Sequence, residues 1–411
     1  MISNERNYSL SRTVVLAMAV FSVLYNIAFI GRETFALGRL AVLFLFCWAI
    51  IEKRNVFRYM RSKAWVLFIP VPAVALQFLL VPDFGQLSRF MYLAYFSFLG
   101  GALLALLGRN PRIILSAVLI ATTVQAAFLF FSFFSPTYRT WFDATVLSGS
   151  NYDASYLYRA PGFSSEAGAS LSVIQSFGVF AGWLLLRENE CFISIRGKAT
   201  YLVLFGMLMS ALSCVIVGRT GLLLSCLFLF LFLISYGLRL RVLIFLSLFL
   251  VVAAAVLNQF LSGLLDAGFS IDFFEQWAFG FFTGKDETVS TLAAMPIPPL
   301  GLDTFFGTGL VSTVDGANPS GHDSGMVQTY YSMGLFFAVT LYCIYLYVLW
   351  HILDWFPVLY RLLFTLVIFS LDIKEPFLFK YSVMFILMAL YFSMRWIRPE
   401  ERPASVLPVK T

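Results

Sequence analysis

The sequence predicts an all-α integral membrane protein, on the strength of its composition, its apolar runs and the distribution of its basic residues. Of the 411 residues, 60% are hydrophobic and 12% are charged. Soluble domains carry about 25% charged residues, so this chain has too little ionic surface to remain in water. The composition therefore excludes collagen-like, disordered and soluble two-domain proteins.

Apolar runs account for most of the chain, and a run of about 20 residues is long enough for one membrane-spanning helix. We expect twelve such helices, over residues 12–30, 37–51, 64–82, 87–108, 111–135, 168–186, 199–217, 220–236, 240–258, 325–350, 355–371 and 377–396. The first run exceeds a signal-peptide core in length, so we interpret it as a retained span. Residues 1–397 would then form a single polytopic transmembrane domain, and residues 398–411 a cytoplasmic tail.

The basic residues indicate the orientation of these helices. If the N-terminus is cytoplasmic, 19 of the 28 basic residues face the cytoplasm and nine face outward. By the positive-inside rule this asymmetry places both termini in the cytoplasm. The net charge of +6 is then explained by topology, and no nucleic-acid partner is expected. The five cysteines lie in or beside apolar runs and predict neither a disulfide framework nor a metal site.

Two connections exceed the length of a turn, residues 136–167 and 259–324, and both are expected on the outer side. Long connections of this kind are usually functional. In the second, Phe260 to Trp277 interleave aromatic and aliphatic residues with acidic ones, which predicts an amphipathic helix at the membrane surface.

Arg219 stands out because it lies between two apolar runs with almost no loop to carry it into water. A charge at membrane depth is costly, and such a residue indicates a functional site. The alternative is an arginine whose side chain reaches the lipid headgroups.

A second group of polar residues, Arg159 and Ser164 to Glu166, precedes the run that starts at 168, and Arg139 is a weaker candidate from the same loop. By itself this stretch is also typical of a loop with a serine helix cap and an acidic first turn.

His322 lies where the tenth predicted span begins, and a lone interfacial histidine is more often structural than catalytic. Three predicted spans, the sixth, eighth and tenth, start on the outer side, and their N-termini carry Ser165/Glu166, Arg219/Thr220 and His322/Asp323/Ser324. Helix N-termini favour anions, and arginine matches phosphate oxygens with two parallel hydrogen bonds. If these spans are neighbours, the sequence predicts a site for a lipid-linked phosphate or diphosphate.

With these residues in place, the chain resembles the bacterial O-antigen polymerase (Wzy) and O-antigen ligase superfamily, whose members are multi-span glycosyltransferases of the GT-C class. The resembling segments are Arg159–Glu166, Gly218–Leu222, Phe306–Leu310, His322–Gln328 and Tyr331–Gly334. The Pro-Gly-Phe-Ser-Ser-Glu and Asp-Ser-Gly stretches are more similar to the polymerase, whereas a histidine before the tenth span is also characteristic of the ligase.

The resemblance implies a GT-C-like fold, an active site at the periplasmic face of the bacterial inner membrane, and transfer without a metal ion, cofactor or nucleotide sugar. The substrates would be oligosaccharide repeat units linked to undecaprenyl diphosphate, and the partners a chain-length regulator and a repeat-unit flippase. A polymerase would move the growing glycan onto the non-reducing end of an incoming unit, and a ligase would move it onto lipid A core.

On this hypothesis Arg159 and Arg219 hold the diphosphate, with Arg139, Thr220 and Ser324 as further substrate-binding residues. His322 accepts the proton of the attacking hydroxyl, and Asp323 or Glu166 orients it or replaces it as the base. A lipid-linked sugar transporter is the competing class. Transporters commonly carry inverted repeats and ionisable residues at the membrane midplane, and neither is evident here.

Overall fold

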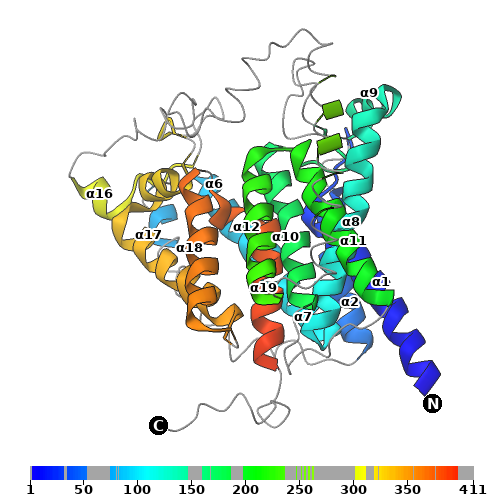
Figure 1. Cartoon of the computed structure of the whole chain (residues 1–411). Coiled ribbons are helices and arrows are strands. Elements are labelled where there is room, and N and C mark those ends of the chain that lie inside the picture. The colour runs from blue at the N-terminus through cyan, green and yellow to red at the C-terminus, as the bar shows by residue number, and fades with distance from the viewer. Residues whose placement is uncertain are drawn as a thin grey trace. The chain divides into compact units, whose positions relative to one another are not determined.

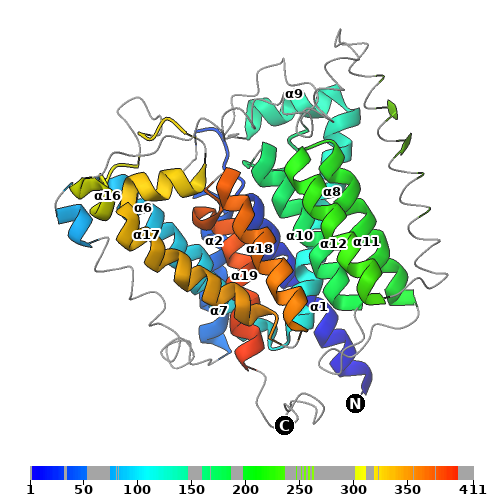
Figure 2. The same ribbon diagram turned by 60° about the vertical axis from the view of Figure 1, so that its left-hand side comes forward.

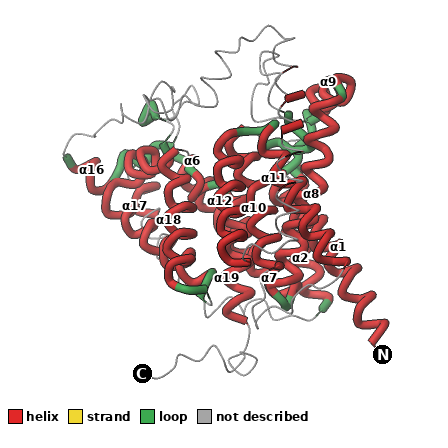
Figure 3. The backbone as a smooth tube through the Cα atoms, in the orientation of Figure 1, coloured by secondary structure: helices red, strands yellow, loops and turns green. Residues whose placement is uncertain are grey.

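The computed structural model describes most of the helical part of the chain: residues 2–31, 35–52, 75–79, 81, 83–146, 160–166, 168–186, 198–236, 301–311, 319–322, 324–354, 356–374 and 376–396, with scattered residues between 247 and 262. These ranges are mostly helical (Figure 3) and contain no strand beyond an isolated bridge between Phe29 and Val146. The described residues therefore agree with the all-α prediction.

Four helices in the described ranges are long and apolar enough to cross a membrane: Phe84–Gly108, Pro111–Phe134, Gly168–Leu186 and Gly325–Ile352. Shorter apolar helices occupy Leu10–Tyr25, Leu37–Ile51, Ala199–Val215, Arg219–Ile234 and Tyr381–Met394. Each of these segments coincides with a predicted run. The runs at 64–82 and 240–258 lie largely outside the described residues, and the total of twelve spans stays a prediction.

The chain divides into two compact units, which are described separately. Unit 1 comprises residues 1–48, 107–270 and 395–411, and unit 2 comprises residues 49–106 and 271–394. Unit 1 contains α1 (Ile2–Tyr25), most of α2 (Leu37–Ile51), α8 (Pro111–Phe134), α9 (Pro136–Thr145), α10 (Gly168–Leu186), α11 (Lys198–Val215) and α12 (Arg219–Tyr236). Within it, α10 packs against α8, α11 and α12 (Figures 1 and 2).

Small residues let α10 approach its neighbours closely. Ideal Cβ atoms at Gly178 and Gly182 would lie 2.2 Å from Thr122 Oγ1 and 2.1 Å from Met207 Cγ. Two glycines four residues apart form one face of a helix, a spacing that membrane helices use where backbones come close. These glycines therefore set how near α8 and α11 lie to the buried helix.

Unit 2 contains a span built from α6 (Phe84–Tyr92), the π-helical η2 (Leu93–Gly100) and α7 (Gly101–Gly108), of which Leu107 and Gly108 belong to unit 1. It also contains α16 (Leu302–Phe306), α17 (Gly325–Ile352), α18 (Val358–Lys374), the 3₁₀ turn η3 (Phe377–Phe379) and α19 (Tyr381–Trp396), whose last two residues fall in unit 1. The helix α17 packs against α16 and α18.

Two boundaries differ from the predictions. The first apolar run was expected to be helical to residue 30, but α1 ends at Tyr25 because Asn26 adopts a φ of 38°. Residues 136–167 were expected to be a loop, yet α9 occupies their first part. The oxygen of Ser135 accepts the N–H of Tyr138 and Pro136 follows, which is a strong helix start.

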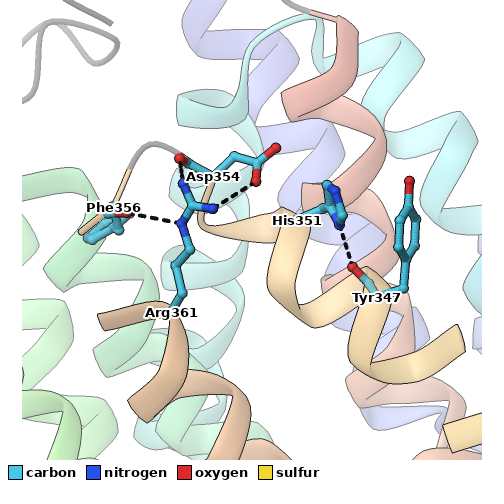
Figure 4. A network of polar contacts seen from close by, with 5 residues as sticks. All are labelled: Tyr347, His351, Asp354, Phe356 and Arg361. Atoms are coloured by element: carbon cyan, nitrogen blue, oxygen red, sulfur yellow. Dashed lines mark hydrogen bonds and ion pairs between the residues drawn. The ribbon is translucent and has the colours of Figure 1, made fainter. Parts of the chain in front are cut away.

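His351 and Asp354 lie at the C-terminal end of α17 (Figure 4). His351 Nδ1 lies 2.7 Å from the carbonyl oxygen of Tyr347 in the last turn of α17. Arg361, from α18, donates to the side chain and carbonyl of Asp354 and to the carbonyl of Phe356. The arginine therefore binds carbonyls of the turn that joins α17 to α18.

Candidate functional site

The predicted segment before α10 is an ordered, buried stretch of irregular backbone, residues 160–166. The N–H of Ala160 donates to the carbonyl of Ile216, 3.1 Å away, in the turn that precedes α12. The hydroxyl of Tyr138, from α9, donates to the carbonyl of Gly162 at 2.8 Å. The 160–166 segment is therefore fixed to two elements that are distant in sequence. Burial raises the pKa of Tyr138 to about 12, so its hydroxyl remains a donor at physiological pH.

Gly162 is required at the centre of this segment. Its φ is 62°, and a Cβ there would lie 2.5 Å from Gln125 Nε2. Gln125 is fully buried in α8, and its Oε1 accepts the N–H of Phe163 at 3.2 Å. The ring of Phe163 stacks 6.3 Å from that of Trp141 in α9. The Pro-Gly-Phe part of the motif is thus held by packing as well as by hydrogen bonds.

The two serines of the motif connect this segment to α1. The N–H of Ser165 donates to the carbonyl of Tyr25 at 3.0 Å, and its Oγ accepts the N–H of Ala28 at 3.0 Å. Ser164 is buried, and its Oγ accepts the N–H of Glu166 at 2.9 Å. The alternative that a serine caps the following helix is wrong, because α10 begins only at Gly168. Glu166 is half-buried at the end of the segment.

Arg219 is the first residue of α12 and Thr220 is the second, one residue earlier than the predicted start of the run at 220. Both are half-buried. The N–H of Gly221 donates to Ser172 Oγ of α10 at 3.1 Å, so a side chain from one helix satisfies a free N–H in the first turn of the other. The sixth and eighth predicted spans are therefore neighbours. The third N-terminus, that of α17, belongs to unit 2 and is considered by itself.

Arg139 is tied to the helix that precedes it. Its Nε donates to the carbonyl of Ser132, 2.8 Å away, near the end of α8. Burial raises the pKa of Asp143 and the positive charge of Arg139 opposes that rise. These contacts fit a residue that stabilises the junction of α8 and α9. Two further predicted site residues, Arg159 and Asp323, lie outside the described residues.

In unit 2, His322 is buried, with 6% of its surface exposed, just before α17. Its Nδ1 accepts the N–H of Ser324 at 2.9 Å. A ring nitrogen that accepts a hydrogen bond carries no proton, so in the neutral ring the proton is on Nε2. This arrangement makes Nε2–H a hydrogen-bond donor.

Ser324 is the residue at the cap position of α17, and it is fully buried. It makes no cap hydrogen bond, and its Oγ has no partner among the described residues. One turn further on, Gln328 Nε2 donates to the carbonyl of His322 at 3.1 Å, and its Oε1 accepts from Arg89 Nη2 at 3.5 Å.

The sequence analysis did not single out Arg89. The cost of a charge at membrane depth, which drew attention to Arg219, would also have drawn attention to Arg89, because Arg89 lies within the Phe84–Gly108 span.

Two more resembling segments, Phe306–Leu310 and Tyr331–Gly334, lie side by side. The N–H groups of Thr308 and Gly309 donate to the carbonyls of Tyr331 and Ser332 at 2.8 and 3.0 Å. The partner carbonyls are free because α17 is kinked at Gly334, where φ is 72°. Gln77 bridges both segments, since its Nε2 donates to the carbonyl oxygens of Phe306 at 2.7 Å and Ser332 at 3.1 Å.

Unit 2 also holds a buried acid that the sequence analysis missed. Asp372 of α18 is fully buried, and it accepts a short hydrogen bond from the hydroxyl of Tyr342 in α17. Among the described residues, no group of three or more His, Cys, Asp or Glu could hold a metal ion.

Comparisons with protein-family models, curated proteins and solved structures return no match for this chain.

Proposed function

We propose that the chain is a polymerase for O-antigen or a related surface polysaccharide. It would transfer the growing glycan from undecaprenyl diphosphate to the non-reducing end of an incoming lipid-linked repeat unit, at the periplasmic face of the bacterial inner membrane. One observation supports this most: short segments that resemble the family lie next to one another within each unit. The 160–166 segment is bonded to the turn before Arg219, and Thr308 and Gly309 are bonded to the kinked part of α17.

The paired segments matter because irregular backbone at membrane depth is tolerated only where it is buried in protein or lines a polar cavity. Both clusters are irregular, and both lie at helix ends for which the positive-inside rule predicts the outer side. Irregular segments that are held by specific hydrogen bonds support a catalytic or binding role more than a simple connection between spans.

In unit 1, the proposal assigns the leaving diphosphate to Arg219, with Arg159 as its partner and the N-terminus of α12 nearby. Arginine forks and helix N-termini both stabilise phosphate oxygens, and this favours the transition state as the sugar–phosphate bond breaks. Thr220 and Ser324 stay proposed substrate-binding residues. Arg139 receives a positioning role, because it is bonded to the carbonyl of Ser132.

In unit 2, the hydrogen bond from Ser324 favours a donor role for His322 over the proton-acceptor role derived from the sequence. The Nε2–H would donate to an anionic or hydroxyl oxygen of a substrate. The base that removes the proton from the attacking hydroxyl is then one of the two carboxylates already named, Asp323 or Glu166. Neither a metal ion nor a nucleotide sugar takes part in the proposed transfer.

The function is tested by deleting the gene in its host and analysing surface polysaccharide and carrier-lipid extracts on gels. Complementation uses the wild type and the Arg219→Ala variant, with protein levels checked by immunoblot. The proposal expects core bearing a single repeat unit in the deletion and a ladder restored only by wild type. Bare core with polymer retained on the carrier lipid would assign the ligase activity instead, and repeat units retained at the cytoplasmic face would assign a transporter.

The role of His322 is tested with three substitutions. Asparagine can still accept the Ser324 N–H but has no donor at the Nε2 position, whereas glutamine can place an amide N–H there. If His322 is a donor, His322→Gln keeps more ladder synthesis than His322→Asn or His322→Ala. Equal losses of about 10²- to 10⁴-fold in all three would support the base role and contradict the donor role.

A further inference from the structure

Arg89 is a charged residue with unused hydrogen-bonding capacity at the start of a membrane-spanning helix. Its Nη2 contacts Gln328, and its guanidinium carbon lies 5.2 Å from the centre of the Phe379 ring. Its Nη1 is buried and has no hydrogen-bond partner among the described residues. A buried guanidinium donor without an acceptor costs free energy unless a ligand supplies the acceptor.

The N-terminus of α17 lies close to this arginine, because Gln328 in its first turns bonds to both Arg89 and His322. Up to the kink at Gly334, this part of α17 runs from Gly325 to Met333, nine residues, and its positive end is not capped by a side chain. Ser324, at the cap, is fully buried with its Oγ unpartnered among the described residues. Two independent unpartnered polar groups therefore accompany a helix N-terminus.

The carboxylate of Asp83 is held by backbone N–H groups near Arg89. The carboxylate that acts on Arg89 is Asp83, whose two oxygens accept the N–H groups of Gly85 at 2.7 Å and Val311 at 2.8 Å. Asp83 is thus already engaged as a helix cap.

We propose that Arg89 and Ser324, at the N-terminus of α17, form a diphosphate-binding site in unit 2. The arginine fork and backbone N–H groups match phosphate oxygens, and the Phe379 ring contacts the planar guanidinium. This inference rests on the proposed function. A polymerase holds two lipid diphosphates at once, one on the donor and one on the acceptor, and the Arg219 site in unit 1 accounts for only one of them.

The test uses the full chain, purified in lipid nanodiscs, in an Arg219→Ala background so that the site in unit 1 does not mask the second one. Undecaprenyl diphosphate, inorganic diphosphate and phosphatidylglycerol are titrated separately. Arg89→Ala and Arg89→Lys are compared with Arg361→Gln, which removes a positive charge at the opposite end of α17. Thermal unfolding of every variant without ligand checks that each one folds.

Loss of a charge-assisted hydrogen bond weakens binding by roughly 10- to 100-fold, so we expect Arg89→Ala to bind both diphosphates that much more weakly. Arg89→Lys should recover part of this loss, and Arg361→Gln should bind as its parent does. If Arg89→Ala fails to fold, the comparison of Arg89→Lys with its parent decides, since lysine keeps the charge but loses the fork.

Unchanged diphosphate binding in the folded Arg89 variants would overturn the site. Arg89-dependent binding of phosphatidylglycerol alone would also overturn it, because the cluster would then hold membrane phospholipid. These outcomes are separate from the proposed function. The glycan ladder of the deletion strain decides whether the chain is a polymerase, whereas the titrations decide whether Arg89 binds diphosphate.

Discussion

The contact between Gly221 and Ser172 determines how closely α12 approaches α10, and replacing Gly221 by alanine tests its importance. A Cβ at Gly221 would lie 2.0 Å from the carbonyl oxygen of Ser172 and 2.2 Å from its carbonyl carbon. Non-bonded heavy atoms attract at about 3.5–4.0 Å, so the helices must separate by more than ~1 Å. The obstruction is backbone within a helix, so no side-chain rotation can relieve it.

Overpacking of this kind typically costs about 1–3 kcal/mol, and we expect Gly221→Ala to reach the upper end. The separation would also break the Gly221 N–H bond to Ser172 Oγ and shift Arg219, two residues away. The expected result is a lower unfolding temperature in detergent together with a lost glycan ladder. Gly301→Ala is the control, because nothing lies within 4 Å of its ideal Cβ and its backbone is extended.

A comparison with Gly182→Ala tests whether backbone or side-chain atoms cause the loss of stability. At Gly182 the obstruction is the flexible Met207 side chain, 2.1 Å from the ideal Cβ, so Met207→Ala should relieve part of the cost of Gly182→Ala. Ser172→Ala should give no such relief to Gly221→Ala, since the carbonyl stays in place. Wild-type stability and a full ladder in Gly221→Ala would refute the reasoning.

Three further predictions concern single hydrogen bonds. Ser172→Ala removes the acceptor of an N–H in the first turn of α12 and should cost about 1–3 kcal/mol, measured by unfolding in detergent; a change below experimental error would contradict the assigned bond. Tyr138→Phe removes the bond to the 160–166 segment and should cost about 0.5–1.5 kcal/mol. Because burial raises the pKa of Tyr138 to about 12, its contribution to stability is constant below pH 10 and is lost as the pH rises from 10 to 12. The difference in tyrosinate absorbance between wild type and Tyr138→Phe should therefore titrate near pH 12, and a difference that titrates at pH 10 would argue against burial. Tyr342→Phe removes a donor from the buried carboxyl of Asp372, so it should cost about 1–3 kcal/mol, and much less in an Asp372→Asn background; equal costs in both backgrounds would show that the two residues are not coupled.

Part of the candidate site followed from the sequence. The start of α12 at Arg219 was predictable because an ionisable residue between two apolar runs has to lie near a membrane boundary. The predicted phosphate site required the sixth and eighth spans to be neighbours, which the sequence could not show. The Gly221–Ser172 hydrogen bond shows that they are. The importance of Gly162 could not be predicted, since its φ and its contact with Gln125 arise from packing against α8.

For His322, the sequence identified a residue type and a position, and the structure shows which ring nitrogen accepts a hydrogen bond. A histidine can accept or donate a proton, and the N–H of Ser324 on Nδ1 favours the donor. For Arg89, the sequence shows a charged residue within an apolar run but not which residues surround it. Its contact with Gln328 joins positions 239 residues apart, and no local pattern encodes that distance.

The sequence by itself determined that this is a helical membrane protein and where most of the described helices lie. The physical reason is local, because in lipid each segment must satisfy its own backbone hydrogen bonds, and an apolar run can do so only as a helix. Only the tertiary structure decided which helix ends meet, which glycines permit it and which polar groups stay unsatisfied. Those outcomes depend on side-chain packing between segments that are distant in the sequence. Lipid is as apolar as the helix surfaces, so no hydrophobic force selects the helix pairs, and the hydropathy of the sequence cannot predict them.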